Sequence, residues 1–167
     1  MNAQFWLVGL SNTVHLLLTV IWIGWSVLLP LVVAPRVVEA HSEGTGWVVI
    51  LSKRLPPLGY GALGGLGATG MIQMSAHPQY DGLFAVSNLW SSLLFAKHLL
   101  ILGSVAFIAY LGLSVTPQLR LAIRRQALGK PNKLNLFVAR FRMVAWLNFA
   151  TGLGVLLLTG LMTALRF

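Results

Sequence analysis

The stretch FWLVGLSNTVHLLLTVIWIGWSVLLPLVV, from Phe5 to Val33, decides the fold class, because it contains no Asp, Glu, Lys or Arg. A helix needs about 20 mainly apolar residues to cross roughly 30 Å of hydrocarbon. Three further stretches meet this requirement, at residues 55–76, 90–115 and 143–165. The sequence therefore predicts an all-α integral membrane protein, a four-helix bundle that forms a single transmembrane domain over residues 1–167.

Prolines mark the expected ends of the first two spans. Pro30 and Pro35 should end the first span, because proline has no N–H to donate to the helix. Pro56 and Pro57 are expected in the first turn of the second span, where a missing N–H costs little.

The composition supports the same class. Hydrophobic residues make up 57% of the chain and charged residues 9%, and there is no cysteine. A soluble domain carries about 25% charged residues. These figures exclude a soluble enzyme, a disulfide framework, a thiolate metal site and a cysteine nucleophile.

The charges predict how the bundle is oriented. Twelve Lys and Arg face three acids, and ten of the twelve fall in two segments, residues 34–54 and 116–142. An even number of spans separates these segments, so the positive-inside rule makes both of them cytoplasmic loops and puts both termini outside. We interpret the basic run as a topology signal that rests on anionic membrane lipid, not as a nucleic-acid site. The expected location is a bacterial-type inner (plasma) membrane, crossed several times.

Three ionisable side chains fall inside the predicted spans: His15, Lys97 and His98. Such groups cost about 2.5–3.5 kcal/mol each at bilayer depth. At about 1.5 Å per helical residue, His15 lies about 15 Å below Phe5, and His98 lies about 12 Å below Trp90. Two histidines at one depth on different helices can ligate one metal, which is how a bundle holds a b-type haem through two imidazoles.

Plainer interpretations of these groups remain open. Each histidine could simply hydrogen-bond a neighbouring hydroxyl or carbonyl. The Lys97 ammonium could snorkel along an apolar surface, or pair with a haem propionate, an anionic substrate group or Asp81.

Other side chains are expected to surround this level. Trp22 shares one helix face with His15 and should point into the bundle as part of the cofactor site. Thr159 and Thr163 could hold the second ring nitrogen of a ligand histidine. The Gly61–Gly65 pair has the small-xxx-small spacing that lets a helix or a flat macrocycle approach the backbone.

A second candidate metal site lies at the end of the second span. Met71, Met74 and His77 recur every three residues, and thioethers with an imidazole suit Cu(I). Methionine at this spacing is more often packing, so copper is the less favoured cofactor.

The segment from His15 to Gly24, HLLLTVIWIG, resembles the first-helix motif of the copper-resistance protein D family, a histidine followed by Trp-x-Gly. Three other places are similar to that family: the Gly70 end of the second span, Phe95-Ala-Lys97, and Asn148 with Thr151-Gly152. The resemblance implies a four-helix membrane protein that binds haem b or handles copper.

Other stretches resemble a related group, the haem-containing bacterial protoporphyrinogen IX oxidases. They are residues 34–41, APRVVEAH, residues 53–56, KRLP, and Lys97 in the third span. In that group the first-helix histidine and the third-helix lysine are the functional pair, which here implies His15 and Lys97. The chain departs from it by adding His98 and by having Val37-Val38 where the group is rich in aromatic residues, and both departures favour a bis-histidine cytochrome.

The leading functional hypothesis is therefore a membrane cytochrome b, with haem iron ligated by His15 and His98 and with Lys97 and Trp22 beside the cofactor. It would transfer electrons between a quinone or membrane partner protein and an external carrier. The alternatives are a protoporphyrinogen IX oxidase, a copper uptake or resistance protein that uses Met71, Met74 and His77, and an accessory subunit of a larger complex or a homo-oligomer.

Overall fold

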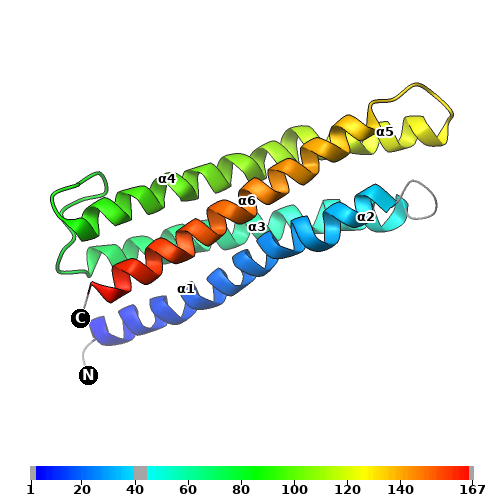
Figure 1. The fold of residues 1–167 in the computed structure, drawn as a ribbon. Helices are drawn as coiled ribbons and strands as arrows, with labels where there is room; N and C mark the ends of the chain where they lie inside the picture. The colour runs from blue at the N-terminus through cyan, green and yellow to red at the C-terminus, as the bar shows by residue number, and fades with distance from the viewer. Residues whose placement is uncertain (1–2, 40–44, 166–167) are drawn as a thin grey trace.

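A computed structural model describes residues 3–39 and 45–165, and every regular element within them is helical (Figure 1). In chain order the elements are α1 (Ala3–Leu28), the π-helical turn η1 (Leu29–Val33), α2 (Ala34–Glu39), α3 (Thr45–Ser75), α4 (Leu89–Tyr110), the π-helical turn η2 (Leu111–Val115), α5 (Thr116–Ala127) and α6 (Leu134–Ala164). The all-α prediction is confirmed.

Three helical rods in the described part of the chain are long and apolar enough to cross a membrane: Phe5–Arg36, Leu89–Ala127 and Leu134–Ala164. They contain the first, third and fourth predicted spans. The second predicted span lies in α3, whose repeated glycines supply little apolar surface. The membrane-spanning character of three helices is thus supported, and the fourth span stays a prediction.

The prolines do not end the helices as expected. The first rod continues past Pro30 and Pro35 to Glu39, and α3 begins at Thr45, far ahead of Pro56. Around Pro30 the backbone widens into η1, where the Ala34 N–H bonds the Leu29 carbonyl. The helix thus continues past both prolines with one π-helical turn between its α-helical parts.

The predicted loops 34–54 and 116–142 are also largely helical, which corrects the sequence-based expectation. α2 and the start of α3 occupy much of the first segment, although residues 40–44 and the side chains of 37–56 lie outside the described part. In the second segment, α5 and α6 leave only residues 128–133 as a turn. The helices extend because Leu119, Ala122 and Phe141 bury apolar surface together.

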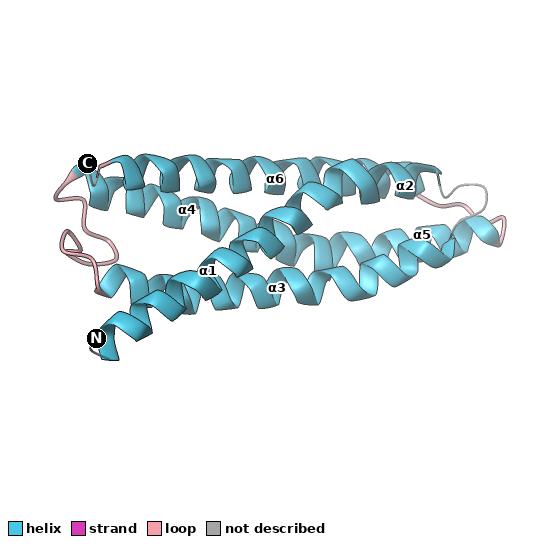
Figure 2. Ribbon diagram, turned by 90° about the horizontal axis from the view of Figure 1, so that it is seen from below, coloured by secondary structure: helices cyan, strands magenta, loops and turns pink. Residues whose placement is uncertain are grey.

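The helices associate as two pairs that separate toward the end of the molecule where the N-terminus lies. Figure 2 shows α1 beside α3 at its N-terminal end and crossing so that α2 lies beside α6. The N-terminal part of α1 is accordingly exposed, and Phe5, Leu10, Leu16 and Val20 are between 55% and 71% accessible. Apolar side chains that face outward in this way suit a lipid environment.

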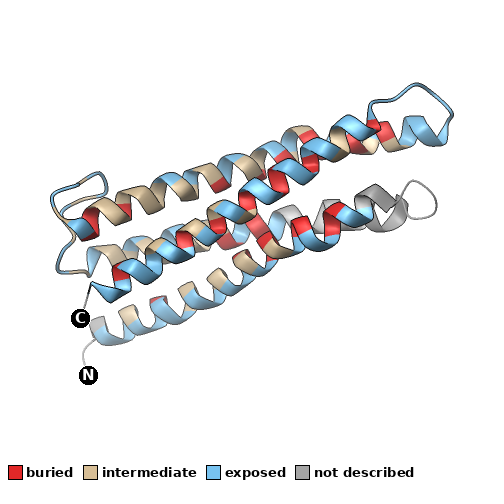
Figure 3. Cartoon of the chain, in the orientation of Figure 1, coloured by how far each residue is buried: buried red, intermediate tan, exposed pale blue. Residues whose placement is uncertain are grey.

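Buried residues gather along the inner faces of the rods (Figure 3). The largest cluster joins the two π-helical turns to α5 and α6, and includes Leu29, Leu111, Leu119 and Phe141. A polar contact links three helices above it, because the Ser104 hydroxyl donates to Asn148 Oδ1 at 2.7 Å and Asn148 Nδ2 donates to Ser26 Oγ at 3.2 Å. These hydrogen bonds hold together α1, α4 and α6, and the first two of these helices carry residues of the candidate site.

Candidate functional site

His15 belongs to α1 and is hydrogen-bonded to α3, the helix with which α1 pairs. Its Nδ1 is 2.7 Å from the Thr69 hydroxyl. Ser11, one turn earlier, donates to the Thr69 carbonyl at 3.2 Å. A Cβ on Gly70 would lie 3.6 Å from His15 Cε1, which is van der Waals contact. The imidazole ring therefore lies close beside the α3 backbone at this glycine. The imidazole is therefore held by a hydroxyl on one side and by the α3 backbone beside it.

The hydrogen bonds of Thr69 assign the tautomer of His15. The hydroxyl has one proton, and it donates that proton to the Gly65 carbonyl at 2.7 Å. Its oxygen then accepts from His15 Nδ1–H, so Nε2 carries the lone pair. Nε2 is the nitrogen that an imidazole offers to a metal when its other nitrogen donates a hydrogen bond.

His98 on α4 has the same protonation pattern for a different reason. Its Nδ1 is 2.7 Å from the Leu94 carbonyl. A carbonyl oxygen only accepts, so Nδ1 must be the donor and Nε2 again carries the lone pair. Both intramembrane histidines thus present the same ligand atom.

Two apolar clusters show which parts of α3 and α4 lie at one depth. Leu66 belongs to the same cluster as Leu100, and Met74 belongs to the same cluster as Leu94. Thr69 lies between Leu66 and Met74 on α3. It is therefore level with the stretch of α4 between the two leucines.

Lys97 and His98 lie in that stretch of α4, at the depth of His15. Helices α1 and α4 bring His15, Lys97 and His98 to one level. No direct contact joins the two imidazoles within the part of the chain that the structure describes. Sequence spacing alone also predicted this common depth.

Lys97 is half-buried and has no hydrogen bond or ion pair with any described side chain. Asp81, the acid suggested as its partner, instead bonds the Ser87 hydroxyl and accepts from Asn88 Nδ2 at 3.2 Å. Asn88 in turn caps α4, because its side chain accepts from the Ser91 N–H at 2.8 Å. Asp81 therefore orders the loop between α3 and α4, and the ammonium can receive an anion.

Trp22 lies deeper than His15 and is 2% exposed. Its ring packs with Ala62, Val155 and Leu100 from the other three long helices. The indole Nε1 is buried and has no hydrogen-bond partner. Trp22 thus points into the bundle as predicted, and it separates the histidine level from the core below.

The predicted role of Thr159 and Thr163 is wrong. Thr159 donates to the Val155 carbonyl at 2.8 Å and Thr163 to the Thr159 carbonyl at 2.9 Å, both within α6. Thr69 holds the His15 ring instead, and sequence reasoning missed it. The available signal was the position of Thr69 in the glycine-rich second span, at the depth predicted for the histidines.

Met71, Met74 and His77 are engaged differently from one another. Met71 is 63% exposed, and Met74 packs against the cluster of Trp90. The His77 ring stacks on Trp90 with centroids 4.1 Å apart, and its Nδ1 accepts from the Gln79 N–H at 3.2 Å. These contacts are packing contacts, and a copper site here stays a prediction.

Among the side chains that the structure describes, those of residues 5–36 and 57–165, no group of three or more His, Asp or Glu gathers to hold a metal. A haem iron needs only two protein ligands, because the porphyrin supplies the others. No known protein family, curated protein or solved structure matches the chain. The functional interpretation therefore depends on the site alone.

Proposed function

We propose that the chain is a four-span membrane cytochrome b, with α3 as the fourth span. His15 and His98 would be the axial ligands of a haem b in the outer half of the bilayer. The observation that carries the proposal is the pair of imidazoles at one depth, each with Nδ1 engaged and Nε2 carrying a lone pair.

The residues at this level fit such a group in their chemistry. Two neutral imidazole nitrogens suit the iron of a b-type haem, and the uncompensated Lys97 ammonium suits a propionate. When bound, the haem would supply reversible one-electron exchange. His15 and His98 together would leave the iron no open position, which favours electron transfer over oxygen chemistry.

The chain's own residues would hold this arrangement in place. Thr69 and the Leu94 carbonyl keep each ring in the ligand tautomer. Lys97 would orient the cofactor through its carboxylates, and Trp22 would exclude water from the inner side. The proposed partners are a quinone or membrane protein on one side and an external electron carrier on the other.

The test is an absorbance spectrum of the purified full chain, oxidised and reduced, with haem supplied during expression. We expect Soret and α bands in the wild type, and loss or strong shift of both in His15→Ala and in His98→Ala. His77→Ala is the matched control, because His77 lies at the helix end and should leave the spectrum unchanged. A wild-type protein without these bands would overturn the proposal.

One observation favours a second candidate, a protoporphyrinogen IX oxidase that depends on His15 and Lys97. Lys97 lies at the depth of His15 and lacks an acidic partner among the described side chains. Product formation in a strain without its own oxidase tests this role. Rescue by the wild type and by His98→Ala, with loss in Lys97→Met, would support the oxidase over the cytochrome.

A further inference from the structure

The outward side of α5 carries an ordered set of side chains. Leu121, Arg124 and Arg125 lie on one face of α5, and Leu128, the residue that caps its C-terminal end, extends the spacing i, i+3, i+4, i+7. We call these four residues the docking face. Leu121 is 51% and Leu128 is 69% exposed, and both arginines are exposed. At 100° per residue, one arginine lies on each side of the line of leucines.

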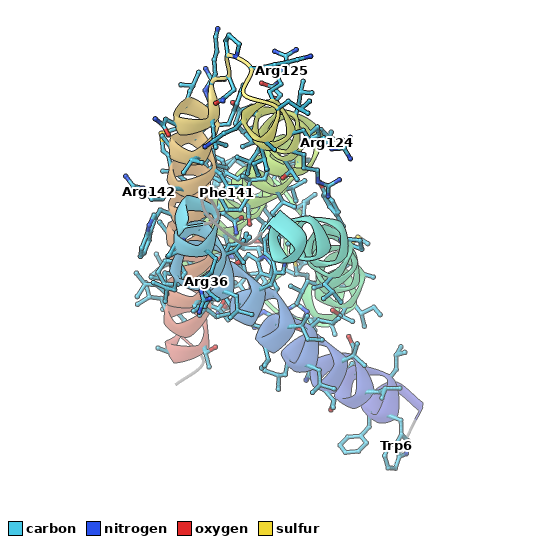
Figure 4. The ribbon with its side chains drawn as sticks, turned by 90° about the vertical axis from the view of Figure 1, so that its right-hand side faces the viewer. Trp6, Arg36, Arg124, Arg125, Phe141 and Arg142 are labelled. Atoms are coloured by element: carbon cyan, nitrogen blue, oxygen red, sulfur yellow. The ribbon has the colours of Figure 1, made fainter. Side chains whose placement is uncertain are left out.

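The opposite side of α5 is fixed against the rest of the molecule. Thr116, Leu119 and Ala122 are buried, and the latter two belong to the largest core cluster. Figure 4 shows Arg124 and Arg125 projecting from α5 at the end of the molecule, away from α6 and its Arg142. The docking face therefore belongs to a packed helix that cannot turn its leucines inward.

The docking face lies beyond the membrane. The predicted third span ends at Val115, which sets the inner hydrocarbon boundary. Leu121 and Arg124 then lie about 9 and 14 Å farther out, at about 1.5 Å per residue. The headgroup layer is only about 5–8 Å thick on each side. The backbone of α5 at both residues thus lies beyond the lipid phosphates.

The chemistry of the docking face selects a protein partner. Residues 116–142 contain no acid, so the arginines have no carboxylate within their own segment. Arginines alone would suit any polyanion, but exposed leucines between them add an apolar contact that a nucleic-acid backbone does not need. The complementary surface is a helix with an apolar stripe flanked by acidic side chains.

We propose that α5 is the docking site for an acidic amphipathic helix of a partner protein on the inner side of the membrane. The leucines would supply the buried centre of the contact and the arginines would pair with carboxylates at its edges. This proposal depends on where α5 lies relative to the bilayer and not on the haem.

The test uses the full chain in nanodiscs of zwitterionic lipid and a fluorescent synthetic helical peptide as the probe. The peptide carries leucines at helical spacing between glutamates, and a scrambled peptide of the same composition is the control. We expect the ordered peptide to bind and the scrambled one to bind at least about tenfold more weakly. Binding should weaken as salt rises.

Matched variants separate the docking face from general positive charge. Leu121→Ser/Leu128→Ser and Arg124→Gln/Arg125→Gln should each weaken binding at least about tenfold. Arg140→Gln/Arg142→Gln removes the same charge from α6, nearer the membrane, and should leave binding within about twofold. All six residues are exposed, so the fold should persist in each variant.

Four results would overturn the proposal. One is equal binding of the ordered and scrambled peptides. Another is equal loss in the α5 and α6 arginine variants. A third is tighter binding to duplex DNA than to the peptide. The last is a docking face that becomes protected when anionic lipid is added or when two copies associate in the absence of peptide.

Discussion

At the scale of single residues, one neighbouring atom decides what each histidine can do. The Leu94 carbonyl accepts from His98 Nδ1, so Nε2 keeps its lone pair. The Gln79 N–H donates to His77 Nδ1 instead, so in neutral His77 the proton lies on Nε2. The two side chains are the same, and their hydrogen bonds favour opposite tautomers of the neutral ring.

The hydroxyl of Thr69 is expected to matter for cofactor retention. Thr69→Val removes the acceptor of His15 Nδ1 while keeping the volume, so the ring loses its orientation. We expect haem affinity to fall about 10–100-fold, as for other outer-shell partners of metal ligands. Thr69→Ser keeps the hydroxyl and should restore affinity, which titration of the haem-free protein with haemin would measure. Equal affinity in the valine and serine variants would contradict this role.

The sequence could predict the depth of His15 and His98, because depth follows from counting residues along a helix. It could not predict that Thr69 holds His15, because that contact depends on how α1 and α3 are rotated against each other. Asp81 was misassigned for a similar reason. Its partners Ser87 and Asn88 lie in its own loop, whose turn the spacing does not reveal.

At the scale of elements, some glycines of α3 lie against side chains of α1 and others have no neighbouring atom close by. A Cβ on Gly65 would come 2.5 Å from Leu18 Cδ1 of α1, and one on Gly59 would come 3.3 Å from the Trp25 ring. A Cβ on Gly61 would meet no atom within 4 Å. Only one member of the predicted Gly61–Gly65 pair therefore serves the close approach of α1.

This difference predicts unequal effects of the same substitution. Gly65→Val should destabilise the folded protein by about 1–3 kcal/mol, because Leu18 must move out of a packed contact. Gly61→Val projects into open space and should stay within about 0.5 kcal/mol of the wild type. Unfolding in detergent micelles gives both values. A larger loss for Gly61→Val would mean that another helix covers this side of α3.

The elements were predicted better than their ends. The four apolar stretches each lie in one long helix, because apolar length is written directly in the sequence. The prolines were misleading, since the helix continues past Pro30 through the π-helical turn η1, in which the Ala34 N–H bonds the Leu29 carbonyl. Nor does hydropathy reveal α2 and α5, whose packing requires the neighbouring α6.

At the scale of the whole molecule, charge is distributed unevenly along the rods. Arg124, Arg125 and Arg142 lie toward the end with α5, as Figure 4 shows, and Asp81 lies in the loop at the other end. The positive-inside rule makes the basic end cytoplasmic. This orientation is a proposal that labelling can decide.

Single cysteines provide that test, because the chain has none of its own. Phe84→Cys lies in the outer loop, where Phe84 is 78% exposed, and should react with a membrane-impermeant thiol reagent in intact cells. Gln126→Cys at the end of α5 should react only after the membrane is opened. The wild type should stay unlabelled throughout. The reverse pattern of labelling would show that the basic end faces outward.

The two π-helical turns also indicate where the chain can change in length. Each holds one residue more than a regular turn, with the Ala34 N–H reaching Leu29 and the Thr116 N–H reaching Leu111. Such a turn absorbs an insertion of one residue without disturbing the helix on either side. Both lie in the same core cluster, below the histidines and above the docking face. A one-residue deletion within η1 or η2 should therefore be tolerated by the helical segments on both sides of that turn. These two positions are where related chains can differ in length.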